Sequence, residues 1–156
     1  MGMPKHRFFD QVRHYFGDVF AQYGFTSVEE SCPAGPRGSA IMLLTSDVCQ
    51  IRFLHDARGD EITIEVGHQS GRLFDVALPF EFLMRTQADG EFYHYPSRTL
   101  GLYGEKRIAW QLERLAKMLR PIWPAIFAVL QPDTPENDAF KAYMSDRSRR
   151  LRKRRG

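Results

Sequence analysis

The stretch SAIMLLTSDVCQIRFLHDARGDEITIEVGH, residues 39–68, decides the fold of this chain. It divides into three segments of strand length, Ser39–Thr45, Val48–His55 and Glu61–His68, joined by short polar or glycine-containing links. In the second and third segments apolar residues alternate with polar ones, which gives each strand one apolar and one polar face. Links of this length connect neighbouring strands as hairpins, and a sheet with one polar face is antiparallel. The stretch therefore predicts an antiparallel meander.

Two further elements precede this stretch. Phe25–Cys32 alternates loosely and predicts a first strand, which makes the meander four-stranded. Residues Pro4–Tyr23 carry aromatic residues and valines at steps of three and four, the spacing of an amphipathic helix. Gly24 is placed to end that helix in a left-handed conformation. The breadth of the apolar stripe indicates that this helix covers the sheet.

Helices dominate the chain after the meander. Leu73–Leu78 fits a short edge strand or a loop, and Pro79–Gln87 fits a brief helix. Glu105–Gln131 keeps a helical period that Pro121 and Pro124 must bend or break, because proline removes an amide donor. We therefore predict an α+β fold, in which an N-terminal helix, a four-stranded antiparallel meander and C-terminal helices on one face form a single domain over residues 1–131. Residues 132–156 are predicted to form a linker, a short helix and a basic tail.

The last ten residues, Arg147–Gly156, carry seven cations and no acid. The whole chain has 22 Lys and Arg against 19 Asp and Glu, a net charge of +3. Without the seven, 15 cations face 19 acids, so the body carries about −4 and the tail +7. The high isoelectric point thus belongs to the tail and not to the body of the fold.

The tail has three interpretations. Clustered cations bind phosphates without sequence specificity, which predicts a nucleic-acid contact. Alternatively they favour the helix macrodipole and solubility, or they contact an acidic protein, including the acidic body of a second copy. The nucleic-acid interpretation names as contacts Arg147, Arg149, Arg150, Arg152, Lys153, Arg154 and Arg155.

The segment Glu91–Arg98, Glu-Phe-Tyr-His-Tyr-Pro-Ser-Arg, is the second candidate site. It lies in a long connection without helical or strand periodicity, and such connections are often functional. Tyrosine and arginine are enriched at interface hot spots, so we predict partner contacts from Tyr93, Tyr95 and Arg98. The alternative is that the aromatic side chains fold back on the edge of the core.

Composition indicates a cytoplasmic protein without a membrane segment. The longest apolar run, Pro121–Leu130, is about half a membrane span, and no signal-peptide core follows the early cations. Cys32 and Cys49 lie in predicted strands without metal-ligand spacing, and we interpret them as reduced, buried thiols. A disulfide between neighbouring strands is the alternative.

We found no catalytic or metal-binding motif in the sequence, and we predict no cofactor. His55 and His68 end facing strands near Asp56, Asp60 and Glu61, but a metal site needs three or four convergent ligands. We interpret these residues as solvated acids and strand-end histidines. The protein is predicted not to be an enzyme, with an unrecognised hydrolase or transferase as the alternative.

Three parts of the strand region, Gly38–Asp47, Cys49–Phe53 and Arg58–Gly67, resemble small bacterial proteins of unknown function. Some α+β proteins of that kind are immunity or accessory partners of toxins. The resemblance covers roughly residues 24–84; it implies an α+β fold and a binding role, and it transfers no functional residue.

The sequence therefore predicts a non-catalytic cytoplasmic interaction module, of the immunity or accessory type, that acts by stoichiometric binding to an unidentified protein. The alternative function is a nucleic-acid-associated protein that binds the phosphate backbone through its tail. The oligomeric state and the partner's identity do not follow from the sequence.

Overall fold

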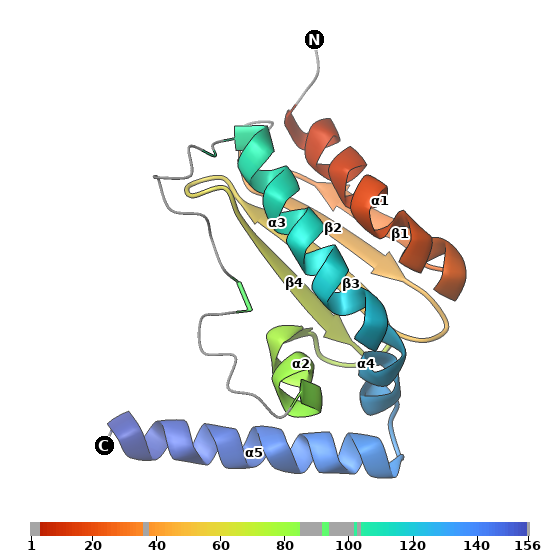
Figure 1. Ribbon diagram of the computed structural model, residues 1–156, viewed down its shortest axis with the longest axis vertical. Coiled ribbons are helices and arrows are strands. Elements are labelled where there is room, and N and C mark those ends of the chain that lie inside the picture. The colour runs from red at the N-terminus through yellow and green to blue at the C-terminus, as the bar shows by residue number, and fades with distance from the viewer. Residues whose placement is uncertain (1–3, 36–37, 85–91, 94–101, 103, 156) are drawn as a thin grey trace.

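A computed structural model of the protein describes residues 4–35, 38–84, 92–93, 102 and 104–155 (Figure 1). Its strands form one antiparallel sheet in the order β1-β2-β3-β4-β5: β1 Thr26–Ser31, β2 Ala40–Thr45, β3 Gln50–Asp56, β4 Glu61–Gly67 and β5 Phe74–Asp75. The helical elements are α1 Pro4–Tyr23, α2 Ala77–Met84, α3 Gly104–Leu119, the 3₁₀ turn η2 Arg120–Ile122, α4 Trp123–Leu130 and α5 Pro135–Arg155. The α+β fold and the meander are thus as predicted.

The strand count is a correction, because the sheet has five strands and not four. The fifth, β5, comes from the segment that fitted either an edge strand or a loop. It pairs with β4 through Glu65 opposite Asp75 and Val66 opposite Phe74. Two residues are too few to show an alternating pattern, so the sequence could not distinguish this strand from a loop.

One face of the sheet is covered by helices and forms the core. Helices α1 and α3 lie side by side across it, and α4 follows α3 at its end (Figure 1). Phe16 of α1 lies with its ring centroid 4.9 Å from that of Phe53 in β3 and 6.5 Å from that of Trp123 in α4. The inward positions predicted for β3 and β4 are all buried: Cys49, Ile51, Phe53, Ile62, Ile64 and Val66.

The opposite face of the sheet carries the alternate side chains. Arg52 and Glu65 lie opposite each other in the register, and a guanidinium nitrogen lies 2.5 Å from the carboxylate. Ile41, Leu43 and Leu54 on the same face are only partly buried.

The C-terminal helices change direction at the prolines. Helix α3 ends at Leu119, Pro121 lies in the 3₁₀ turn, and Pro124 lies in the first turn of α4. Gly24 at the end of α1 has φ of 72°, the left-handed conformation predicted for it. Within the described ranges, no helix combines the length and the apolar character needed to cross a bilayer.

Helix α5 begins after the linker and continues through the basic residues. Its first turn is capped by Thr134, whose Oγ1 accepts a hydrogen bond from the Asn137 amide at 3.1 Å, and Pro135 occupies the first helical position. The helix is 21 residues long and ends at Arg155. Arg147 to Arg155 therefore lie on a helix that continues from the buried residue Phe140.

Candidate functional site: a cationic groove beside helix α5

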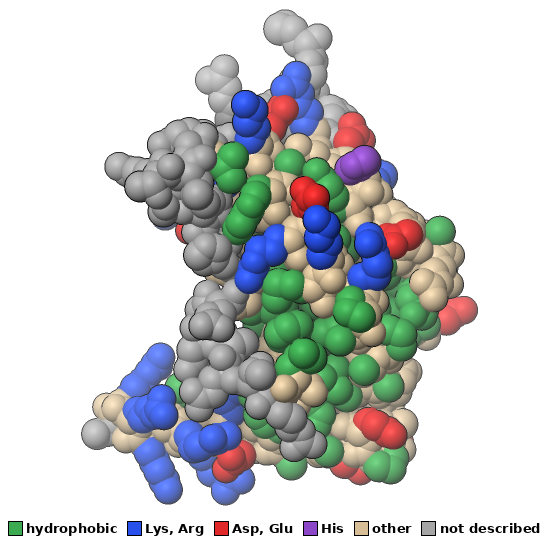
Figure 2. Space-filling view, in the orientation of Figure 1, with side chains coloured by type: hydrophobic (Ala, Val, Ile, Leu, Met, Phe, Trp, Pro, Cys, Tyr) green, Lys and Arg blue, Asp and Glu red, His purple; other side chains and the backbone are tan. Residues whose placement is uncertain are grey.

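A groove of about 710 Å³ runs between α5 and the connection from β4 to β5. Figure 2 shows Lys and Arg side chains gathered over the second half of α5, with few acidic side chains among them. The described residues that line the groove include five cations and no acid: Arg72, Phe74, Leu78, Lys141, Met144, Ser145, Arg147, Ser148, Arg149 and Arg152.

The first wall is the β4–β5 connection, which is held by β3 and by a glycine. The Gln50 side chain donates to the backbone carbonyls of His68 at 3.0 Å and Gln69 at 2.9 Å. A Cβ atom on Gly67 would collide with the backbone carbonyl of Arg72, so the chain can fold back this closely only at a glycine. These constraints place the Arg72 backbone beside the end of β4 and its exposed side chain at the groove.

The second wall is α5, which is fixed to the domain by its first half. Phe140 is 1% exposed, and its ring centroid lies 5.5 Å from that of Phe82 in α2 and 6.2 Å from that of Phe74 in β5. The buried Asn137 side chain donates to the carbonyl of Val129 at 2.8 Å. Both contacts precede the basic residues, so they set the direction in which the basic half extends.

Arg147 joins the two halves of α5. Its Nε lies 3.2 Å from Oε2 of Glu81 in α2, a carboxylate whose side chain is 10% exposed. Burial raises the pKa of Tyr143, one turn earlier, and a hydrogen bond to Glu81 raises it further. Arg147 thus neutralises a carboxylate that is almost buried, and it stabilises the fold as well as lining the groove.

The other groove residues of α5 follow the helical period. They are spaced three or four residues apart and therefore lie along one side of the helix: Lys141, Ser145, Ser148 or Arg149, and Arg152. Arg150 lies outside this series and pairs with Asp146 at 3.0 Å. Within the described part of the chain, no ion pair involves Arg72, Lys141, Arg149 or Arg152.

The sequence identified part of this site. Arg147, Arg149 and Arg152 were predicted as nucleic-acid contacts and line the groove, whereas Arg150, Lys153, Arg154 and Arg155 do not line it. Sequence reasoning missed Arg72 and Lys141. The helical period over Glu136–Arg155 could have connected Lys141 with Arg149 and Arg152. No local signal points to Arg72, because its place depends on the packing of α5 against β5.

Of the aromatic candidates, Tyr93 lies within the described residues, and Tyr95 and Arg98 lie outside them. The Tyr93 hydroxyl donates to Oδ1 of Asp75 at 2.7 Å, and it bridges the backbone amide and carbonyl of Ile64, each at 3.1 Å. Burial raises the pKa of Asp75, although its bonds with the Ala77 amide and with Tyr93 act in the opposite direction. Tyr93 therefore packs on the edge of the sheet beside β5, and its partner contact stays a prediction.

The two strand-end histidines do not share a hairpin, which corrects their placement. In the observed register His55 lies opposite Ile62, whereas His68 follows Gly67, which pairs with Gln50 at the other end of β3. His55 lies 3.1 Å from Asp60 and its ring stacks on Phe8. No group of three or more His, Cys, Asp or Glu side chains in the described ranges could hold a metal ion.

No disulfide joins Cys32 and Cys49. Cys49 is fully buried as predicted, and burial raises its pKa to about 12, whereas Cys32 is only partly buried. A thiol with so high a pKa holds its proton at neutral pH and is a poor nucleophile.

Comparison with known proteins does not add to this description. No family model, curated protein or solved structure matches the chain.

Proposed function

We propose that this chain is a non-catalytic cytoplasmic interaction module, and that it binds an acidic segment of a partner protein in the cationic groove. One observation carries the proposal: Arg72 from the β4–β5 connection and four cations of α5 line the same groove, and no acid lies among its described lining residues. These cations come from two elements that are distant in sequence, and together they create one region of positive electrostatic potential. An anionic partner complements that region.

The composition of the groove favours a protein segment over a bare polyanion. Phe74, Leu78 and Met144 line the same groove as the cations, so its surface contains both apolar and positively charged groups. An acidic peptide that also carries apolar side chains matches both kinds of group, because apolar contact supplies affinity and charge supplies orientation and rate of association. The buried, reduced thiol of Cys49 supports the cytoplasmic location.

Charge reversal inside and outside the groove tests the proposal. Arg149→Glu with Arg152→Glu changes two lining residues, and the matched control Lys153→Glu with Arg154→Glu makes the same charge change on the same helix outside the groove. Each full-length variant serves as bait in a nuclease-treated lysate of the native host. We expect a stoichiometric protein that the wild type and the control retain and the groove variant loses. Equal loss by both variants would overturn the proposal.

Nucleic-acid binding is the second candidate, and the end of α5 supports it. Arg150, Lys153, Arg154 and Arg155 extend the positive charge beyond the groove, over the exposed last turns of the helix. Phosphate binding by such residues predicts an affinity for an oligonucleotide that falls steeply with salt. It also predicts equal weakening by the two pairs of substitutions, since counterion release depends on the number of cations and not on the groove. Fluorescence anisotropy over a salt series measures both.

The aromatic segment needs its own test. Because Tyr93 is hydrogen-bonded to Asp75 and to β4, its substitution would change stability together with binding. The double variant Tyr95→Ala with Arg98→Ala leaves Tyr93 and its hydrogen bonds in place. If the segment contributes contacts, this double variant loses the partner in the same capture experiment while its melting temperature stays unchanged; retained binding would remove these two residues from the site.

A further inference from the structure

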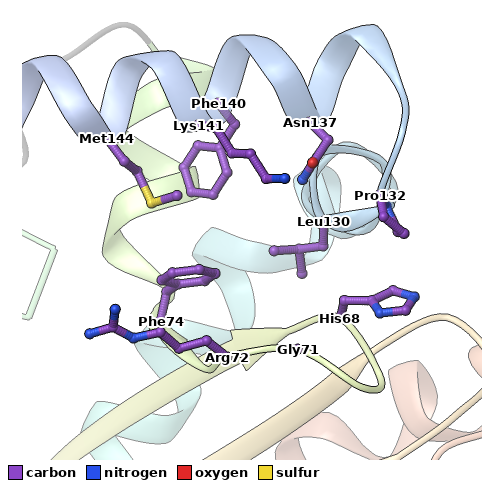
Figure 3. Close-up of a pocket in the computed structure, with 10 residues that line it drawn as sticks. All are labelled: His68, Gly71, Arg72, Phe74, Leu130, Pro132, Asn137, Phe140, Lys141 and Met144. Carbon is purple, nitrogen blue, oxygen red and sulfur yellow. The ribbon is translucent and has the colours of Figure 1, made fainter.

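The inner end of the groove deepens into a pocket of about 210 Å³ between α5, the end of α4 and the β4–β5 connection (Figure 3). Its apolar wall is formed by Phe74, Leu130, Phe140 and Met144. Figure 3 shows these side chains converging from α5, α4 and β5 on one space. The pocket and the groove share the lining residues Arg72, Phe74, Lys141 and Met144, so they adjoin each other.

The pocket is apolar inside and cationic at its mouth. Leu130 and Phe140 are buried, whereas the side chains of Arg72 and Lys141 are exposed. Asn137 also lines the pocket: its side-chain NH₂ donates to the carbonyl of Val129 and holds α5 on α4, whereas its buried Oδ1 accepts no hydrogen bond from the described residues. The interior therefore selects an apolar group, and the mouth selects negative charge next to that group.

The size of the pocket indicates a single side chain. Pockets for whole metabolites are typically about 300–1,000 Å³ and enclose most of the ligand. The space here is smaller and opens into a longer groove, which is the arrangement for one buried anchor residue with flanking chain outside.

The walls of the pocket are formed in the free protein. Gln50 holds the His68–Gln69 backbone on one side, and Asn137 and the Phe140 ring contacts fix α5 on the other. A preformed site avoids the entropy loss of ordering its walls on binding. An anchor side chain thus gains apolar contact without requiring rearrangement of the pocket.

We infer that this pocket takes one aromatic side chain of the partner's acidic segment, and that carboxylates on either side of that residue pair with Lys141 and Arg72. The inference rests on the proposed function and specifies the chemistry of the segment. The recognised motif is an aromatic residue with acidic neighbours, because an aromatic ring can pack against the rings of Phe74 and Phe140 and carboxylates complement the two cations at the mouth.

Synthetic peptides test the motif directly. Three fluorescein-labelled probes are titrated with full-length protein by anisotropy: a glutamate–serine peptide with one central tryptophan, the same peptide with alanine in its place, and a thymidine oligonucleotide. We expect the tryptophan peptide to bind about tenfold or more tightly than the alanine peptide, since burial of an aromatic side chain has at least that effect.

A variant whose pocket is filled by a larger side chain tests whether the preference for tryptophan depends on the pocket. Met144 is half-buried and lines both the pocket and the groove, so Met144→Trp occupies the space and should abolish the preference for the tryptophan peptide. Because the substitution can also change how the groove binds, the quantity measured is the ratio of the two peptide affinities. Met144→Phe is the milder alternative if the larger side chain prevents folding, which circular dichroism monitors. A preference that survives filling would overturn the inference.

The outcomes separate the inference from the proposed function. If the two peptides bind equally but Arg149→Glu with Arg152→Glu weakens the binding of both, the groove binds acidic segments and the inference of an aromatic anchor in the pocket is wrong. If neither peptide responds to the arginine substitutions, the proposed function fails as well. Tighter binding of the oligonucleotide than of either peptide, insensitive to Met144→Trp, would overturn both in favour of nucleic acid.

Discussion

The two halves of helix α5 differ in burial: the first packs against the domain and the second is exposed to solvent. In the first half Asn137 and Phe140 are buried against α4, α2 and β5. In the second half every described residue from Ser148 to Arg155 is exposed, including Leu151 at 40%. The boundary is Arg147, whose partner Glu81 lies on α2. The buried half thus fixes the position of the helix, and the exposed half presents charge to solvent.

This division explains how a chain with an acidic body displays a positive surface. An isolated run of arginines would repel itself and adopt many conformations. Continuous helix from a buried anchor gives each arginine a defined direction, and the same helix places Lys141 in line with them. The comparison predicts that substitutions in the first half change stability, and that substitutions in the second half change binding.

The largest effect is expected from Phe140→Ala in the anchoring half. Removal of a buried phenylalanine side chain costs about 3–5 kcal/mol of unfolding free energy, and it leaves a cavity between Phe74 and Phe82. Urea denaturation measures the change, with Leu151→Ala as the control in the exposed half, expected to stay within about 0.5 kcal/mol. Equal effects from the two substitutions would show that the halves do not differ.

Arg147→Ala tests the boundary. It leaves the carboxylate of Glu81 almost buried without its cation, which should lower the unfolding free energy by about 1–2 kcal/mol. Glu81→Gln removes the charge that Arg147 neutralises, so the double variant should lose less than the sum of the single losses. Arg152→Ala is the matched control without an ion pair in the described structure. Strictly additive losses would contradict a structural role for the pair.

Asp75, which follows the groove residue Phe74, provides a smaller and pH-dependent effect. Its pKa is raised by burial, so the folded chain holds this proton more tightly than the unfolded chain. The free energy of unfolding therefore falls as the pH rises from the unfolded-state pKa through the folded-state pKa. Asp75→Asn keeps the oxygen that accepts from the Ala77 amide and from Tyr93 and removes the charge. It should remove this decline and make the protein more stable than the wild type at neutral pH.

Thermal denaturation over a pH series checks this prediction. Asp75→Ala is the contrasting variant, because it loses both hydrogen bonds and should be destabilised at every pH. If Asp75→Asn is also less stable than the wild type at neutral pH, ionised Asp75 stabilises the fold and the argument from burial is wrong.

The meander could be predicted from the sequence because each strand carries its own evidence. Alternation along Ile62, Ile64 and Val66 fixes which face is buried, and short links fix the pairing of neighbours. The first helix was predicted at its observed bounds for the same reason, since its apolar stripe and terminal Gly24 are local features. Local signals were sufficient wherever the structure is determined by neighbours in sequence.

The groove could not be predicted in the same way. Arg72 and Lys141 are distant in sequence, and they line one groove only because Phe140 packs against Phe74 and Phe82. The basic residues were visible as a run of charge, but the sequence did not show which of them share a face with the groove. The number of basic residues can be counted in the sequence. Which of their side chains face the groove depends on how α5 packs against α2 and β5.

The smallest effect is expected at the Asp146–Arg150 pair, which spans the boundary at Arg147. Both side chains are 60% exposed and lie 3.0 Å apart at positions i and i+4, so Asp146→Ala should change the unfolding free energy by less than about 0.5 kcal/mol. The substitution also frees Arg150 and removes an acid next to the groove, so the tryptophan peptide should bind more tightly. Denaturation and peptide titration on the same variant measure both quantities. A gain in affinity without a change in stability would place Asp146 on the presenting side of the boundary, whereas a clear loss of stability would extend the anchoring half beyond it.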